Sequence, residues 1–135
     1  ALQKQFIDRT IEKRYVALVN GNVEADNGTI ELPLCLDFDD KPRQMVCYQH
    51  GKAALTTWQV LERKNNTTRL HLFPKTGRTH QLRVHCAHKD GLNMAIVGDD
   101  HYGLKAQRLH LHAEYLFLQH PINHQALVFE VAADF

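Results

Sequence analysis

A β-hairpin signal near the middle of the chain constrains the fold more than any other feature of the sequence. Two strand-like runs, "ALTTWQVLER" (residues 54–63) and "TTRLHLF" (67–73), flank the turn-forming pair Asn65-Asn66. Runs rich in β-branched and aromatic residues on either side of such a pair are typical of two antiparallel strands. The hairpin therefore predicts a sheet in which strands that are close in the chain pair with each other.

Most of the remaining chain also has the pattern of strands. Such runs lie at residues 13–21 ("KRYVALVNG"), 28–34 ("GTIELPL", an edge strand because of its Pro), 44–49, 95–103 ("AIVGDDHYG", a short strand and loop), 108–121 and 126–133. Helical spacing occurs from Thr79 to His88, and "LQKQFIDRTI" resembles the tail of a helix. We therefore expect an α+β fold, with a mixed, mainly antiparallel sheet and few helices, in a single domain over residues 1–135.

The composition is that of a soluble globular domain. The chain has 135 residues, of which 44% are hydrophobic and 23% are charged. No apolar run approaches the length of a membrane span, and the first residues lack the layout of a signal peptide. The three cysteines are widely spaced, which favours reduced thiols and a cytoplasmic location.

The charge is unevenly distributed along the chain. The net charge is only +1, but residues 63–89 carry seven Lys or Arg and no acid. Residues 15–40 carry six acids and no Lys or Arg. A basic segment suits contact with phosphate groups, and a solvated basic face is an equally good interpretation of the charge alone.

The segment "PKTGRTHQLRVHCAH" (74–88) contains four Lys, Arg or Gln side chains and three His, but no acid. We expect Thr79 to cap a helix that follows Gly77, and Arg78 and Arg83 to add positive charge at this corner. Such a corner favours an anion, either a phosphate or an ionised carboxylate. A structural pair of arginines that ties a loop to the sheet is the alternative, with equal weight.

Other residues permit weaker inferences. Tyr15, among small and apolar neighbours, is more often a core residue than a stacking platform for a base. The chain has ten histidines, but it contains no HExxH motif and no closely spaced Cys pair. We therefore expect no metal site. The chain also lacks a Gly-x-Ser-x-Gly elbow and a Walker phosphate loop, which argues against serine hydrolases and nucleotide hydrolases.

Several segments together resemble one known family. They are "EKRYVALV", "GKAALTTWQVLE", "TGRTHQLRVHCAH", "IVGDDHYG", "RLHLHAEYLFLQHP" and "VAADF". In this order they resemble the RluA-type pseudouridine synthases, which isomerise uridine in RNA. The resemblance implies the C-terminal portion of the pseudouridine synthase catalytic-domain fold, no cofactor, and ribosomal RNA as a substrate with tRNA as a second one. It also implies that the target uridine is flipped out of the RNA stack.

The resemblance also assigns roles to individual residues. Tyr15 matches the family tyrosine that stacks on the uracil and is a candidate to accept the proton at C5. Arg83 matches the arginine that pairs with the catalytic aspartate, and Leu82 matches the apolar residue that packs against the base. Three more positions of the same basic segment are expected to bind substrate: Lys75, Arg78 and His80.

One family motif is missing. The catalytic aspartate of the family lies in a His-Arg-Leu-Asp sequence upstream of the tyrosine strand, and these 135 residues contain no such sequence. We therefore expect the chain to be a C-terminal piece of a catalytic domain and inactive alone; pseudouridine formed in an unmodified rRNA transcript would contradict this. We do not assign the missing role to Asp99 or Asp100, because carboxylates in such loops usually cap turns.

A truncated sheet would also expose an edge strand or apolar surface, through which the chain could dimerise. Two other functions remain as alternatives. One is an RNA-binding module without chemistry, and the other is a His-rich metal-binding domain.

Overall fold

The computed structural model describes residues 11–39, 41, 43–103, 108–119, 126–133 and 135. It contains one helix, α2 (Gln81–Ala87), within these residues. The strands are β1 (Ile11–Asn20), β2 (Asn27–Glu31), β3 (Leu34–Leu36), β4 (Gln44–Val46), β5 (Leu55–Lys64), β6 (Thr67–Pro74), β7 (Leu111–Gln119) and β8 (Ala126–Glu130). The expected N-terminal helix tail lies outside the described residues.

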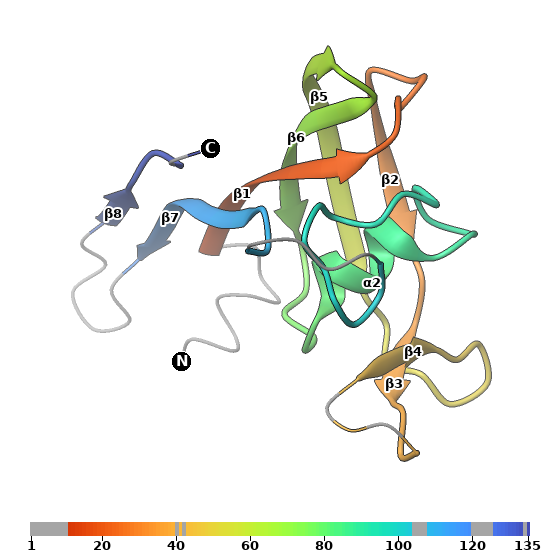
Figure 1. Cartoon of the computed structure of the whole chain (residues 1–135). Coiled ribbons are helices and arrows are strands. Elements are labelled where there is room, and N and C mark those ends of the chain that lie inside the picture. The colour runs from red at the N-terminus through yellow and green to blue at the C-terminus, as the bar shows by residue number, and fades with distance from the viewer. Residues whose placement is uncertain (1–10, 40, 42, 104–107, 120–125, 134) are drawn as a thin grey trace.

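Six of the strands form one sheet, in the order β2-β5-β6-β1-β7-β8, and β3 and β4 form a separate small hairpin (Figure 1). Every pairing between these named strands is antiparallel. The prediction of an α+β fold with a mainly antiparallel sheet is therefore confirmed. Pro33 lies between β2 and β3, so the run 28–34 forms parts of two short strands instead of one, and β2 lies at an edge of the six-stranded sheet.

The predicted central hairpin is formed by β5 and β6. Lys64 pairs with Thr67, and the two residues between them, Asn65 and Asn66, have φ values of 53° and 59°. Two successive residues with positive φ are the geometry of a type I′ turn, which matches the twist of the flanking strands. Asn tolerates this conformation better than most residues, so the turn follows directly from the local sequence.

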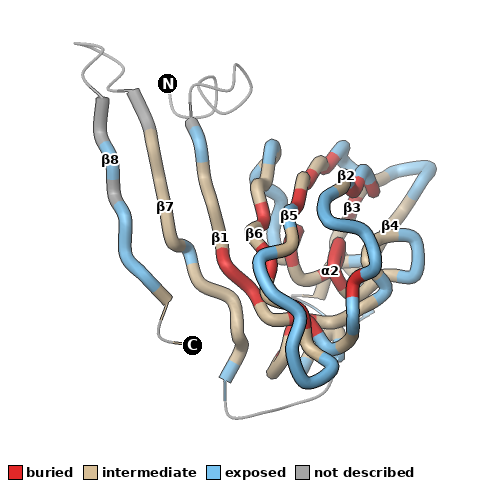
Figure 2. The backbone as a smooth tube through the Cα atoms, turned by 90° about the horizontal axis from the view of Figure 1, so that it is seen from above, coloured by how far each residue is buried: buried red, intermediate tan, exposed pale blue. Residues whose placement is uncertain are grey.

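The core lies between the sheet and α2. Leu70 and Leu72 of β6 are fully buried, and Leu82 and Cys86 of α2 belong to the same cluster of buried side chains. Figure 2 shows that the buried residues gather in β1, β5, β6 and α2, whereas β7 and β8 extend away from the helix. The helix therefore packs on the half of the sheet that contains β5, β6 and β1.

His85 of α2 is a core residue. Its Nε2 lies 3.0 Å from the carbonyl oxygen of Leu32, so this nitrogen carries the proton, and Nδ1 accepts from the Thr56 hydroxyl at 2.9 Å. Burial is the main reason that the pKa of His85 is lowered. One of the ten histidines is thus accounted for by packing and hydrogen bonding.

The buried imidazole predicts a pH dependence of stability. The unfolded chain takes up a proton near pH 6.5, whereas folded His85 takes it up only at lower pH, so the free energy of unfolding should fall as the pH drops from about 7 to 5. The slope from one such group is at most about 1.4 kcal/mol per pH unit. We expect His85→Gln to show a smaller fall in urea unfolding, and His50→Gln, at an exposed position, to keep the wild-type fall. Equal slopes in all three proteins would contradict the prediction.

Three local predictions are wrong. The helix begins at Gln81, its N-cap is His80, with φ of 53°, and no side chain caps it, so Thr79 does not have the expected role. The run 95–103 forms no strand; Ile96 makes only an isolated bridge with Val19. The run 44–49 is a strand only over Gln44–Val46. In each case the surrounding loops decide the conformation over local propensity.

The outer strand β8 forms one edge of the sheet; Val128 within it and Val131 directly after it are exposed. This agrees with an open edge, but dimerisation through it stays a prediction. Among the described residues, no helix has the length and apolar character that crossing a membrane requires.

Candidate active site

The structure brings five of the six predicted site residues to one cleft of about 300 Å³. The cleft lies where the end of β6, the start of α2 and the strand β1 meet. Five of its lining residues were predicted as site residues from the sequence: Tyr15, Arg78, His80, Leu82 and Arg83. The other lining residues are Lys13, Pro74, Thr76, Gly77, Gln81 and Leu111. Lys75 does not line it: this side chain is exposed, with Nζ 5.8 Å from the centre of the Phe73 ring.

Tyr15 lies next to an irregularity in the pairing of β1 with β7, where Glu114 of β7 is the extra residue. The register between β1 and β7 shifts between Arg14 and Tyr15, and Tyr15 pairs with Leu72 on one side and Ala113 on the other. The side chain is half-buried, packs against the main core and also lines the cleft. The two interpretations of Tyr15, core residue and aromatic wall of a site, are thus compatible.

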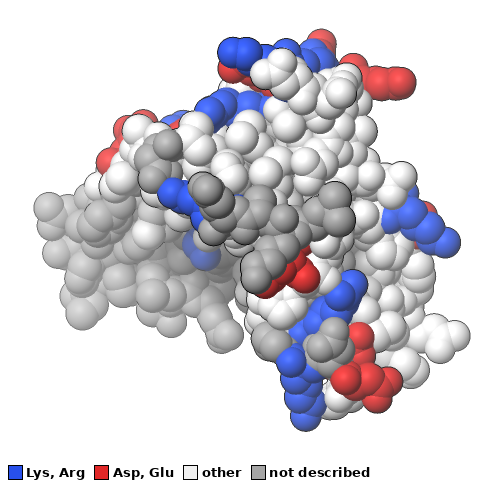
Figure 3. Space-filling view, in the orientation of Figure 1, with Lys and Arg blue, Asp and Glu red and all other residues white. Residues whose placement is uncertain are grey.

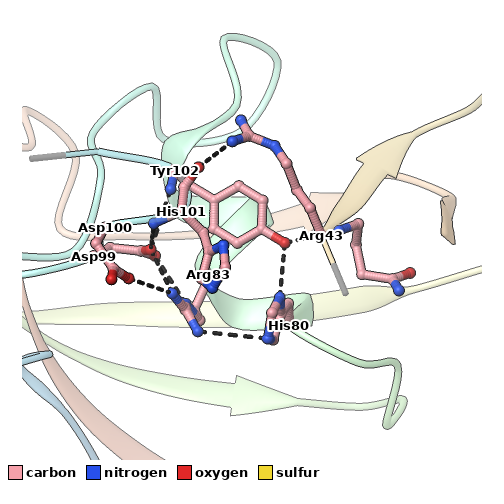
Figure 4. A network of polar contacts seen from close by, with 8 residues as sticks. Arg43, His80, Arg83, Asp99, Asp100, His101 and Tyr102 are labelled. Atoms are coloured by element: carbon pink, nitrogen blue, oxygen red, sulfur yellow. Dashed lines mark hydrogen bonds and ion pairs between the residues drawn. The ribbon is translucent and has the colours of Figure 1, made fainter. Parts of the chain in front are cut away.

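Arg83, in the first turn of α2, holds a carboxylate. Its Nε donates to Oδ2 of Asp99 at 3.0 Å, and its Nη2 donates to Oδ1 at 2.7 Å (Figure 4). Asp99 is fully buried and Arg83 is 15% exposed. The two-point bond to Asp99 raises the pKa of Arg83. The acid-free corner does hold an anion, and in this structure that anion comes from the loop after Ile96.

Asp99 has a second function in its own loop. Its Oδ1 accepts the backbone N–H groups of His101 at 3.1 Å and Tyr102 at 3.2 Å. Burial alone would raise the pKa of Asp99, but the bonds from Arg83 and from the two backbone N–H groups outweigh it, so the pKa is lowered. The expectation that this carboxylate caps a turn is confirmed, and it also anchors the arginine.

Tyr102 joins the cleft to the β3–β4 hairpin. Its hydroxyl oxygen accepts the N–H of Gln44 at 2.8 Å and lies 2.8 Å from Nδ1 of His80. Its ring lies between the guanidinium groups of Arg43 and Arg83, at 4.8 and 5.4 Å (Figure 4). Burial, followed by the charge of Arg83, lowers the pKa of His80. Tyr102 has no predicted role, although the segment "GDDHYG" that contains it carries the family resemblance.

Gln81 is the second residue that the sequence does not single out. It is buried, and its Oε1 accepts the Thr76 hydroxyl at 2.6 Å and the N–H of Arg78 at 3.1 Å. Its Nε2 donates to the carbonyl of Leu55 and the hydroxyl of Thr56, both at 2.9 Å. The amide of Gln81 thus helps to tie the loop 75–79, a wall of the cleft, to the start of β5. The N–H of Lys75, which donates to the carbonyl of Leu55 at 2.8 Å, and the hydroxyl of Thr76, which accepts the N–H of Leu55 at 3.0 Å, hold the same loop.

The basic segment 63–89 does not form one basic surface. Of its seven cations, only Arg78 and Arg83 line the cleft. Arg63, at the other end of the segment, binds Asp26 at 2.9 Å. Figure 3 shows Lys and Arg side chains in separate groups, several of them next to Asp or Glu. Positive charge near the cleft is therefore local.

Comparison with known proteins identifies the family. The sequence model for RNA pseudouridylate synthase matches residues 1–88. The dual-specificity RNA pseudouridine synthases RluA of Pasteurella multocida and Vibrio cholerae are both 44% identical over 140 residues. These alignments cover 99% and 100% of this chain but only 63% and 56% of the two relatives.

Solved structures agree. Human RNA pseudouridylate synthase domain containing 1 superposes with a TM-score of 0.83 at 28% identity, over 98% of this chain and 58% of that protein. Human RNA pseudouridylate synthase domain containing 4 gives 0.73 at 25% identity, over 97% and 61%. The match to the family model, the identity across the whole chain and the shared fold all lead to one assignment: the chain belongs to the RNA pseudouridylate synthase family.

Proposed function

We propose that this chain forms the uridine-binding part of an enzyme that isomerises uridine to pseudouridine in RNA. The observation that carries the proposal is that Tyr15 and Arg83, from different elements, line one cleft together with Leu82. An aromatic ring, an apolar side chain and a fixed cation suit a flipped pyrimidine and the acid that attacks its sugar. Ribosomal RNA is the proposed substrate and tRNA a second one, which places the enzyme in the cytoplasm.

The residues of the cleft divide the chemistry between them. Tyr15 and Leu82 hold the uracil ring while the bond between N1 and C1′ breaks, the ring turns, and C5 bonds to C1′. C5 then loses its proton and N1 gains one, so the product is an isomer of the substrate. We propose the oxygen of Tyr15 as the group that accepts the C5 proton. No part of this sequence requires a cofactor.

Arg83 supplies the electrostatic part of the site. The family resemblance implies a catalytic aspartate in a His-Arg-Leu-Asp motif, which is not among these 135 residues. A guanidinium carries five N–H donors; Asp99 takes one bond from Nε and one from Nη2, and Nη1 lies 3.5 Å from Nε2 of His80. We place the catalytic carboxylate beside Arg83, where it would stay ionised because a neighbouring Arg lowers a carboxyl pKa by about one to three units.

Two substitutions at Tyr15 test the proposal. In the full-length protein, Tyr15→Ala should reduce turnover at least about a hundredfold, because both the stacking face and the hydroxyl are lost. Tyr15→Phe should keep RNA binding and lose turnover. Release of tritium from RNA labelled at uridine C5 measures turnover, since isomerisation requires loss of that hydrogen.

The exposed Tyr48, which lies outside the cleft, gives the matched control Tyr48→Phe, with turnover close to wild type. Wild-type turnover in Tyr15→Ala would refute the proposed site. RNA binding by the full-length wild type without any tritium release would instead favour the non-catalytic RNA-binding module.

A further inference from the structure

A second cleft lies directly beside the first. Its volume is about 420 Å³, and the β3–β4 hairpin and the following segment form one side of it, including Phe38, His50 and Lys52. Gly77 and Arg78 line both clefts. The loop 75–79 is thus a shared wall, and a chain molecule with one unit in the first cleft can continue over this wall into the second.

Both the backbone and the side chain of Arg78 are held in the wall by hydrogen bonds. Its backbone N–H binds Oε1 of Gln81 at 3.1 Å, and its Nε donates to the carbonyl of Ala53 at 2.9 Å. Among the described residues, no acceptor binds its Nη1 or Nη2 groups, and the side chain is exposed. An anchored guanidinium with two outward amino groups suits a phosphate, which it can bind at two points.

The second cleft combines cations with an aromatic ring. Lys52 and His50 are exposed there, and its lining includes no carboxylate. Phe38 is 76% exposed, the most exposed of the large apolar side chains that the structure describes. The neighbouring carboxylate of Asp37 accepts the N–H of Asp39 at 3.1 Å, within the same turn. The ring is therefore presented to solvent beside positive charge, and Nζ of Lys41 lies 5.4 Å from its centre.

We infer that the second cleft binds the nucleotide adjacent to the target uridine on the same RNA strand. Its base stacks on Phe38, the phosphate that joins the two nucleotides lies on Arg78, and Lys52 contacts the next phosphate. Proteins hold single-stranded nucleic acid in this way, by stacking and charge without reading the sequence. The inference rests on the proposed function, because it takes the first cleft as the uridine site.

The test compares RNA probes that differ by one base. The full-length protein is titrated into a labelled single-stranded oligoribonucleotide with one uridine flanked by adenosines, and anisotropy reports binding. Two further probes carry an abasic ribose directly 5′ or 3′ of the uridine. Phe38→Ala should weaken binding of the intact probe about tenfold and leave the affinity for one abasic probe unchanged, since that probe lacks the stacking base.

Matched variants separate this site from the uridine site. Tyr48→Ala removes an exposed aromatic that lines neither cleft and should bind all probes like wild type. Lys52→Ala should weaken all probes and reduce the salt dependence of binding, whereas Lys89→Ala should not. If Phe38→Ala weakens all three probes equally, or none, while Tyr15→Ala weakens the intact probe, the second cleft is not a base site and only this inference is overturned. If Tyr15→Ala also binds like wild type, the proposed uridine site fails with it.

Discussion

Replacing Asp99 with alanine is expected to lower the free energy of unfolding by about 3–5 kcal/mol. Asp99 is fully buried, and its loss would leave the largely buried Arg83 without the carboxylate that its Nε and Nη2 groups bind. The backbone N–H groups of His101 and Tyr102 would lose their acceptor too. Because the guanidinium cannot give up its proton, its charge stays in the protein without compensation. Urea unfolding followed by the fluorescence of Trp58, the single tryptophan, measures the change.

The adjacent carboxylate is the matched control. Asp100 is 59% exposed and its Oδ1 lies 3.6 Å from Nη2 of Arg83, so Asp100→Ala should cost no more than about 1 kcal/mol. The double variant Arg83→Met with Asp99→Ala should be more stable than Asp99→Ala alone, because it leaves no unpaired charge. Equal stability of Asp99→Ala and Asp100→Ala would show that the buried pair does not hold this corner together.

The parts of the fold that follow from neighbouring residues could be predicted from the sequence. The β5–β6 hairpin depends on alternation and on Asn65-Asn66, which form its turn. The helix start could not be predicted in this way. Thr79 has a side chain suited to capping, but the chain turns at His80, whose left-handed conformation is set by bonds to Tyr102 and to the rest of the corner.

In the candidate site, too, some features could be predicted from the sequence and others depend on residues that are distant in the chain. Tyr15 and Arg83 were proposed from the family resemblance, and the structure places both in one cleft. The partner of Arg83 could not be predicted from spacing, because Asp99 is 16 residues away in a loop with little regular structure. The acid-free segment around Arg83 indicated an anion, but a single sequence does not show which distant carboxylate folds back to supply it.

Gln81→Leu is expected to lower the free energy of unfolding by about 2–5 kcal/mol, although leucine has a similar volume. The amide of Gln81 makes four hydrogen bonds in a buried position, to Thr76, Arg78, Leu55 and Thr56. Leucine would leave several of these polar groups buried without a partner, at about 1–3 kcal/mol for each group that water cannot reach. Urea unfolding again measures the loss.

The same substitution should loosen the loop 75–79, whose remaining bonds to the start of β5 are those of Lys75 and Thr76 with Leu55, so the effect extends to the cleft. The backbone of Arg78 would lose its bond to Gln81 and keep only the Nε bond to Ala53, so RNA binding should weaken even under conditions where the variant remains folded. Gln59→Leu, on the exposed side of β5, is the matched control and should change neither stability nor binding by more than a small amount. If Gln81→Leu were as stable as Gln59→Leu, the amide would not be what ties the loop to the sheet. If Gln81→Leu were destabilised but bound RNA with wild-type affinity when folded, the loop would hold its position without it. Both a loss of stability and a loss of affinity are therefore needed to assign Gln81 as the residue that positions the wall.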